Sequence, residues 1–273
     1  GLIMSQVKKI QSGILYQGPS RIDGAPIVMI AIAKSTNSKT GNMVQTYILR
    51  ADMDPITANR TGEDYSICGR CVHRGKANPK KTKGLADGRS CYVNIGQGAG
   101  AVYRAFMAGK YPMLTEEQAR EIGRGRMVRL GTYGDPAALY SARFKALLSE
   151  ALGHTGYTHQ LGEYPGIDTA NLMISADNAR QAQVMHNNGY RTFRVIPVHE
   201  WKDKGVSSML KNEILCPASE EAGRRLSLLV SGSVDQKVFA SADFIIEAVF
   251  EELAIKQKLF KVFIIDIIKE TFF

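Results

Sequence analysis

The chain has 273 residues, of which 44% are hydrophobic and 22% are charged, and its formal net charge is +9 at pH 7. These proportions are typical of a globular protein large enough to bury a full core, and the absence of an apolar run of about eighteen residues excludes a membrane span. The excess of lysine and arginine favours a polyanionic partner, either nucleic acid or a phosphorylated small molecule such as a nucleotide.

The N-terminal part of the chain predicts a β-hairpin followed by a long loop. Residues 26–34 and 42–50 are rich in β-branched and apolar residues, and the turn-forming segment STNSKTGN separates them. Residues 51–89 are polar and rich in glycine, lysine and arginine. A loop of this length is usually functional or disordered, and this one carries the first two cysteines.

From residue 90 the pattern alternates between strands and helices. The predicted strands are SCYVNI, MVRLGTY, YTHQL, ANLMISA and YRTFRVIPV. The predicted helices are QGAGAVYRAFMAGKY, TEEQAREIGRG, DPAALYSARFKALLSEALG and DNARQAQVMHNNG, and Thr115 with Gln118 forms a capping box at the start of the second. Such alternation indicates βα units with a mostly parallel sheet, so we expect an α/β fold, up to a partial or full barrel.

Polar side chains follow several of these strands. In parallel folds the functional site lies at the carboxyl ends of the strands, and those ends carry Tyr133, Asp135, His159 and Asp177. We take Asp135, His159 and Asp177 as candidate catalytic residues, in acid/base or substrate-positioning roles. The alternative is that Asp135, which precedes a proline, and Asp177 only cap helices.

Four cysteines form the second candidate site: Cys68, Cys71, Cys91 and Cys216. No signal peptide is recognisable, so we expect a cytoplasmic protein, in which a Cys-x-x-Cys pair indicates metal or redox chemistry rather than a structural disulfide. Four thiolates suit zinc or an iron–sulfur cluster, and the neighbouring Arg70, His73 and Arg74 are expected to lower the thiol pKa values. The alternative is a set of unligated thiols in a loop.

Two further features point to phosphate. Gly96, Gly98 and Gly100 lie between a predicted strand and a predicted helix, where backbone N–H groups can bind a nucleotide phosphate. The alternative is a glycine-rich turn for close packing. The basic residues of the loop suit contacts with a phosphate backbone, or form a solvated loop.

Several segments between about residues 25 and 224, among them SICGRCVHRG, LMISADNARQA and CPASEEAG, resemble a family of uncharacterised bacteriophage-encoded α/β proteins that contain cysteines. Membership implies a location in the host-cell cytoplasm. The cysteine pattern and the βα repeats are also similar to those of radical-SAM-like barrels. The Cys-x3-Cys-x2-Cys motif of those barrels is not present here.

A second resemblance begins near the C-terminus. The segment SADFIIEAVFEELAIKQKLF (241–260) resembles part of the NAD-binding domain of 3-hydroxyacyl-CoA dehydrogenases, and this resemblance implies that Ala248, Glu251 and Lys256 contact NAD. The glycines of a phosphate-binding loop do not precede the segment, so NAD is not expected as a cofactor. We therefore divide the chain into an α/β domain (1–235) and a C-terminal appendage (236–273).

These features lead to one main hypothesis and two alternatives. The main hypothesis is a phage-type α/β protein that binds zinc or an iron–sulfur cluster through its cysteines and acts on or near nucleic acid or nucleotides. The first alternative is a non-catalytic nucleic-acid-binding module in which the metal is structural. The second is an NAD-binding, dehydrogenase-like fragment. The sequence leaves open whether the protein is an enzyme.

Overall fold

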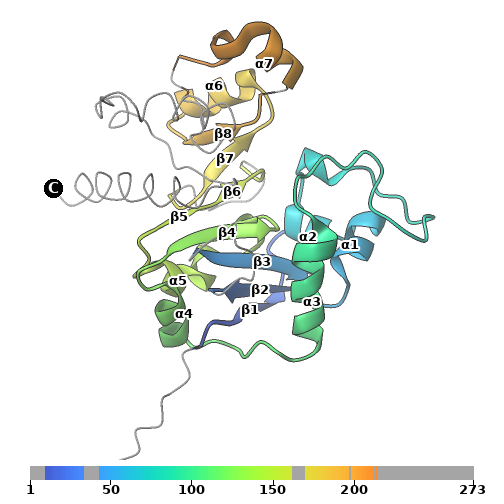
Figure 1. The fold of residues 1–273 in the computed structure, drawn as a ribbon, viewed down its shortest axis with the longest axis vertical. Helices are drawn as coiled ribbons and strands as arrows, with labels where there is room; N and C mark the ends of the chain where they lie inside the picture. The colour runs from blue at the N-terminus through green and yellow to red at the C-terminus, as the bar shows by residue number, and fades with distance from the viewer. Residues whose placement is uncertain (1–9, 34–42, 162–169, 197, 212, 214–273) are drawn as a thin grey trace, which may run out of the picture. The chain divides into compact units, whose positions relative to one another are not determined.

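The protein has an α/β fold, as predicted, and divides into two compact units (Figure 1). The structure, a computed structural model, describes residues 10–33, 43–161, 170–196, 198–211 and 213. The first unit consists of residues 1–36, 42–154 and 162–167, and the second of residues 37–41, 155–161 and 168–273. The domain boundary predicted at residue 235 lies outside the described residues and stays a prediction.

The first unit is built on a five-stranded sheet in the order β1-β2-β3-β4-β5. Its strands are β1 Ser12–Pro19, β2 Pro26–Ile32, β3 Val44–Arg50, β4 Met127–Tyr133 and β5 Gly153–Thr155. The predicted hairpin is confirmed, since β2 and β3 pair antiparallel with Ile27 opposite Arg50 and Ile32 opposite Gln45. The pairing of β1 with β2 is also antiparallel, whereas β4 runs parallel to β3. Strand β1 was not predicted.

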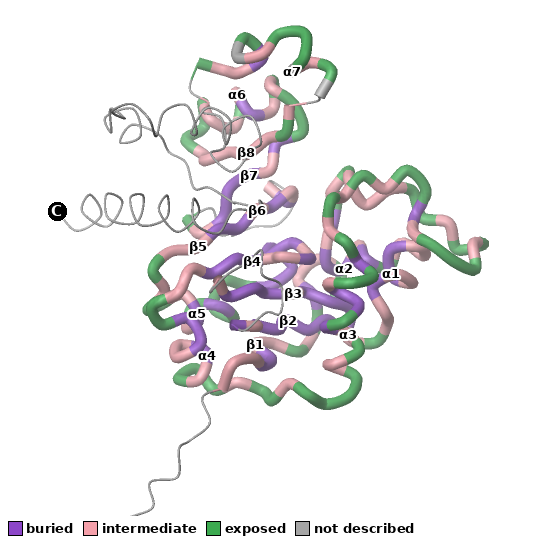
Figure 2. Tube along the Cα trace, in the orientation of Figure 1, coloured by how far each residue is buried: buried purple, intermediate pink, exposed green. Residues whose placement is uncertain are grey.

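The central strands form the core of this unit. In β2 the five residues from Ile27 to Ala31 are all buried, and Figure 2 shows β2 and β3 as buried along most of their length. A strand that is apolar at consecutive positions is covered on both faces, because neighbouring side chains point to opposite sides of the sheet. The hydrophobic runs of the sequence therefore became central strands.

Short helices surround this sheet. They are α1 Pro55–Thr61, α2 Tyr65–Cys68, a 3-10 turn Val72–Arg74, a π-helix Ile95–Ala99, α3 Gly100–Met107, α4 Glu116–Gly123, 3-10 turns Pro136–Ala138 and Ser141–Arg143, and α5 Lys145–Leu148. The capping box of α4 is confirmed, because the Thr115 hydroxyl accepts from the Gln118 amide and the Gln118 side chain accepts from the Thr115 amide. The strand predicted at 90–95 is wrong, and the helix predicted at 135–153 is broken into three short pieces.

The second unit contains a three-stranded parallel sheet in the order β6-β7-β8. Its elements are β6 Tyr157–Thr158, β7 Met173–Ala176, α6 Ala179–Asn187, β8 Thr192–Arg194, α7 Val198–Lys204 and a 3-10 turn Gly205–Ser208. The run β7-α6-β8 is a βαβ unit, which confirms the parallel pairing expected after the loop. The described strands divide between two sheets and do not form the barrel that we allowed for.

None of the helices in the described part of the chain has the length and hydrophobicity needed to cross a bilayer.

Candidate functional site

The first candidate site is the turn that carries Cys68 and Cys71. Helix α2 ends at Cys68, and Gly69 follows with a φ of 52°, a conformation that favours glycine. The amide of Cys71 then donates to the carbonyl of Cys68 at 3.2 Å, which closes a four-residue turn. Both residues are partly exposed, and neither is in a disulfide. The sequence Cys-Gly-Arg-Cys therefore folds into a tight turn with both cysteines at its ends.

Cys91 joins this turn through the backbone. Its amide donates to the carbonyl of His73 at 3.1 Å, two residues after Cys71. Cys71 and Cys91 both act electrostatically on the Cys68 thiol and raise its pKa. Among the described residues, however, the three sulfur atoms do not form a ligand set whose members all lie within 4.8 Å of one another. Cys216 lies outside the described residues, so the four-cysteine ligand set stays untested.

The electrostatics of the turn differ from our expectation. Burial of the Cys68 thiol, followed by the nearby Asp64 carboxylate and the Cys71 thiol, raises the pKa of Cys68 well above its usual value, although Arg74 opposes this. The Arg74 guanidinium is paired with that carboxylate, since its Nε donates to Asp64 Oδ1 at 3.0 Å, and its influence ranks below the three that raise the pKa. The expectation that the neighbouring basic residues lower the thiol pKa is therefore wrong for Cys68.

Tyr133 adds a polar group that the sequence placed at a strand end but did not mark as functional. It is the last residue of β4 and is only 4% exposed, and its hydroxyl has no hydrogen-bond partner among the described residues. Burial, followed by the influence of Cys68 and Asp64, raises the pKa of the Tyr133 phenol well above its usual value. The hydroxyl is thus a buried donor without a described partner, and it lies within the electrostatic influence of Cys68.

Asp135 has a structural role. It is 7% exposed, and its Oδ1 accepts from the Ala137 amide at 2.9 Å, which caps the short turn that begins at Pro136. Its own amide donates to the carbonyl of Ile67 at 2.6 Å. Asp135 belongs to the first unit, whereas His159 and Asp177 belong to the second. The capping interpretation fits this geometry.

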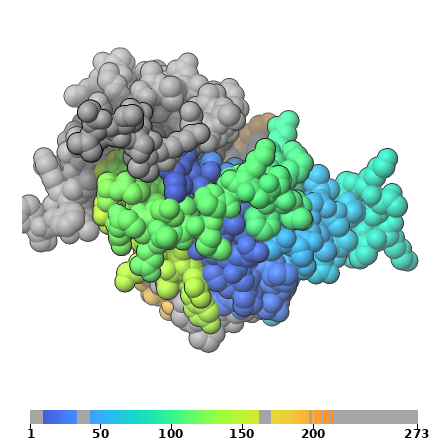
Figure 3. Space-filling view, turned by 90° about the horizontal axis from the view of Figure 1, so that it is seen from below, coloured from blue at the N-terminus to red at the C-terminus, as the bar shows by residue number. Residues whose placement is uncertain are grey.

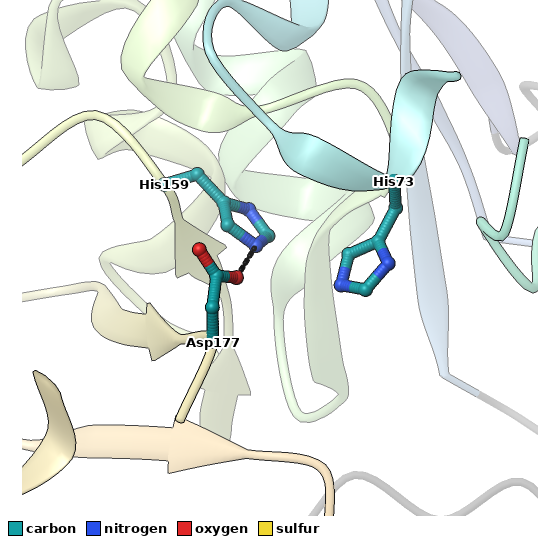
Figure 4. Close-up of side chains that lie close together, drawn as sticks. All are labelled: His73, His159 and Asp177. Atoms are coloured by element: carbon teal, nitrogen blue, oxygen red, sulfur yellow. Dashed lines mark ion pairs between the residues drawn. The ribbon is translucent and has the colours of Figure 1, made fainter. Parts of the chain in front are cut away.

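The second candidate site is the pair His159 and Asp177 (Figure 4). His159 follows β6 and Asp177 follows β7, and these strands are parallel neighbours. The His159 Nε2 atom lies 3.7 Å from Asp177 Oδ1, with the side chains 18% and 32% exposed. The two groups therefore form an ion pair when His159 is protonated, at the carboxyl edge of the sheet, where strand-end reasoning placed them. His73, also drawn in Figure 4, belongs to the first unit.

The start of α6 lies beside this pair. The side chain of Asn178 accepts from the amide of Gln181 at 2.9 Å, and the amide of Asp177 donates to Gln181 Oε1 at 2.7 Å. Asn178, not Asp177, is thus the residue that caps α6. The Asp177 carboxylate is left to face His159 rather than the helix end, so the capping alternative does not hold for Asp177.

The three glycines are part of a helix instead of a loop. The π-helix Ile95–Ala99 runs directly into α3, and the segment directly before it, residues 90–94, is not a strand. The amide of Gly98 donates to the carbonyl of Asn94 at 3.1 Å, and that of Gly100 to the carbonyl of Ile95. Because these amides are bonded within the helix, the packing interpretation of Gly96, Gly98 and Gly100 fits better than a phosphate loop.

Comparison with known families bears on the second unit. The sequence model of a family described as "3-hydroxyacyl-CoA dehydrogenase, NAD binding domain" matches residues 198–270, which are 73 of the 273 residues. The match contains the segment 241–260 and extends that resemblance upstream to α7. No curated protein and no solved structure matches the chain.

This match corrects the cofactor expectation. The sequence predicts zinc or an iron–sulfur cluster and not NAD, because the segment 241–260 is short and no phosphate-binding glycines precede it. The family match is more than three times as long and concerns an NAD-binding domain, so the exclusion of NAD is wrong. The proposed NAD contacts Glu251 and Lys256 lie outside the described residues.

Proposed function

We propose that this protein binds NAD through its second unit. The observation that carries the proposal is the family match over residues 198–270, all of which belong to that unit. The residues that precede the match add a suitable topology, because β6, β7 and β8 are parallel and α6 connects β7 to β8. Open parallel sheets bind dinucleotides beyond the carboxyl ends of their strands.

In this proposal, His159 and Asp177 supply acid/base chemistry at the carboxyl edge of the sheet formed by β6, β7 and β8. Oxidation of a hydroxyl by NAD requires a base that accepts the hydroxyl proton as the hydride leaves, and histidine suits this role near neutral pH. A carboxylate 3.7 Å from the ring orients the imidazole and stabilises its protonated form. In this proposal His159 is the proton acceptor and Asp177 positions it. Asp135 takes no part, because its carboxylate is bonded as a helix cap.

Binding is tested on the full chain with NADH, by titration calorimetry and by nucleotide fluorescence. We expect saturable binding that Lys256→Ala weakens about tenfold, the effect of losing roughly 1.4 kcal/mol from a charged contact. Glu251→Gln tests the second residue that the resemblance implies. Lys110→Ala removes the same charge from an exposed position of the first unit and should leave affinity unchanged. The absence of saturable NADH binding would overturn the proposal.

The acid/base role has its own test. With a 3-hydroxyacyl-CoA as probe substrate, His159→Asn should lower NAD reduction by at least about a hundredfold while NADH affinity stays within twofold. Asp177→Asn should lower the rate less and change its dependence on pH. If His159→Asn leaves the rate unchanged, the role assigned to His159 is wrong even where NADH binds.

A second candidate function, contact with nucleic acid, rests on the loop of the first unit. Residues 70–90 carry seven lysines and arginines and one aspartate. Two of the cations are paired, Arg74 with Asp64 and Lys81 with Asp87, whereas Lys76, Lys80 and Lys83 are exposed. Figure 3 shows part of this loop protruding from the unit. The ion pairs hold the loop in place, and the exposed lysines give it a positive surface.

The test is the salt dependence of binding to a labelled single-stranded oligonucleotide. Removing three phosphate contacts in the variant Lys76→Ala, Lys80→Ala, Lys83→Ala should reduce the slope of log K against log salt by about 2. The control Lys110→Ala, Lys145→Ala, Lys202→Ala removes the same charge from exposed positions elsewhere. Equal slopes for the two variants would show that the loop is a solvated surface.

A further inference from the structure

We propose that Cys68 and Cys71 form a reversible disulfide, and that Cys91 is a third thiol able to exchange with it. The proposal concerns the first unit and is independent of NAD binding. Its basis is the turn in which the Cys71 amide bonds the Cys68 carbonyl at 3.2 Å. A turn of this kind holds its first and fourth Cα atoms within about 7 Å, and disulfides join Cα atoms roughly 4.4–6.8 Å apart.

The three cysteines are more accessible to solvent than structural cysteines buried in a core. All three are partly exposed and none is in a disulfide. Cys71 lies outside α2 and is itself partly exposed, so an external disulfide can approach its sulfur. Buried structural cysteines are inert, whereas redox-active ones are partly exposed and lie near a second thiol. The cluster shares partial exposure and a neighbouring thiol with the second group, and because burial raises the pKa of Cys68, the first attack is assigned to Cys71.

The buried hydroxyl of Tyr133 also supports exchange chemistry at the sulfur atoms of these cysteines. A buried hydroxyl without a partner costs about 1–3 kcal/mol, and Tyr133 has none among the described residues. Cys68 and Cys91 both act electrostatically on this phenol and raise its pKa. A thiolate is a much stronger acceptor than a neutral thiol, so the phenol can donate to the sulfur that becomes negative during exchange. Tyr133 is therefore a positioning residue that stabilises the leaving thiolate.

The reaction balances with a small-molecule disulfide such as oxidised glutathione as oxidant. The Cys71 thiolate attacks one sulfur of that disulfide, which forms a mixed disulfide and releases one glutathione thiol. The Cys68 thiol then loses its proton and attacks the Cys71 sulfur, and the second glutathione thiol leaves. Two protein thiols have lost two electrons and two protons, and the oxidant has gained them as two thiols. Cys91 exchanges by attacking either sulfur of the new disulfide.

The sequence makes the product easy to identify. Trypsin cleaves after Arg70, between the two cysteines, and places Cys68, Cys71, Cys91 and Cys216 on four different peptides. The full chain is equilibrated in glutathione buffers of increasing oxidation, quenched in acid, alkylated and digested. We expect the peptides 61–70 and 71–74 to be joined in oxidising buffer and separate again after reduction. The peptide 212–224, which carries Cys216, should not be joined to either of them.

Variants separate the proposal from non-specific oxidation. Cys71→Ser should abolish the linked pair, whereas Cys91→Ser and the control Cys216→Ser should keep it. Tyr133→Phe should slow reduction of the disulfide by dithiothreitol several-fold, a readout that loss of packing alone does not predict. The proposal is overturned if Cys68 and Cys71 stay fully alkylated in oxidising buffer. It is also overturned if the dominant linked pair contains Cys91 or Cys216.

Discussion

A single buried ion pair organises the region around the cysteines. Asp64 is 2% exposed, and its two carboxylate oxygens accept from Arg74 and from the Asn59 amide. Arg74 also donates to the carbonyls of Gly69 and Gly62. The pair thus ties the Cys-Gly-Arg-Cys turn to helix α1. The ion pair cannot be predicted from local sequence, because Asp64 and Arg74 are ten residues apart in a polar segment.

Removing Arg74 should be strongly destabilising. In Arg74→Ala the buried Asp64 carboxylate loses its charged partner, which costs about 3 kcal/mol, the low end for buried pairs because Arg74 is partly exposed. Urea denaturation followed by circular dichroism measures the loss. Arg124→Ala, whose partners Glu121 and Glu150 are exposed, is the matched control and should cost less than about 1 kcal/mol. Equal losses would contradict the role given to Arg74.

The tip of the basic loop should respond to acid. Hydrogen bonds from Lys81 and then Asn78 lower the pKa of Asp87 below its usual value. A carboxylate with a depressed folded pKa stabilises the fold above its unfolded pKa, and this contribution is lost as pH falls through the folded value. Amide chemical shifts of Lys76 and Lys81 should therefore change together below the usual aspartate range. The transition should be absent in Asp87→Asn, and a transition that persists there would assign it to another group.

At the scale of elements, prediction succeeded where local chemistry decides the structure. The hairpin and α4 follow from consecutive apolar residues and from a capping box, both visible in the sequence. The strand predicted at 90–95 does not form because its backbone groups are bonded elsewhere. The Cys91 amide donates to the His73 carbonyl, and the carbonyls of Cys91 and Val93 accept from the Arg89 guanidinium. Those partners depend on the fold of the loop, which no strand pattern contains.

The capping box offers a test of how far such local chemistry contributes. Thr115→Ala removes the hydroxyl that accepts from the Gln118 amide and should cost about 1 kcal/mol in free energy of unfolding. Thr115→Ser keeps the acceptor and should cost a few tenths at most. Thermal and urea unfolding measure both variants. If they are equally stable, α4 is held by its packing against α5 rather than by its cap.

For the whole molecule, the candidate sites divide between the two units. Strand-end reasoning brought His159 and Asp177 together correctly, because adjacent parallel strands end at one edge. It also grouped Asp135 with them, although that residue belongs to the other unit, since strand order along the chain does not show where one sheet ends and another begins. Tyr133 was visible at a strand end, but its unpartnered hydroxyl is a property of packing.

The division into two units also predicts which segments NADH protects from hydrogen exchange. A ligand that binds only the folded second unit stabilises that unit by about 2.7 kcal/mol at a concentration of 100 times Kd. Hydrogen exchange measured by mass spectrometry should therefore slow about a hundredfold in peptides covering β7 and β8. Peptides covering β2 and β3 should be unchanged, because those strands belong to the first unit. Lys256→Ala at the same NADH concentration is the control and should show weaker protection. Equal protection of both units would mean that they unfold as one cooperative body, and the two-unit description would then fail for stability.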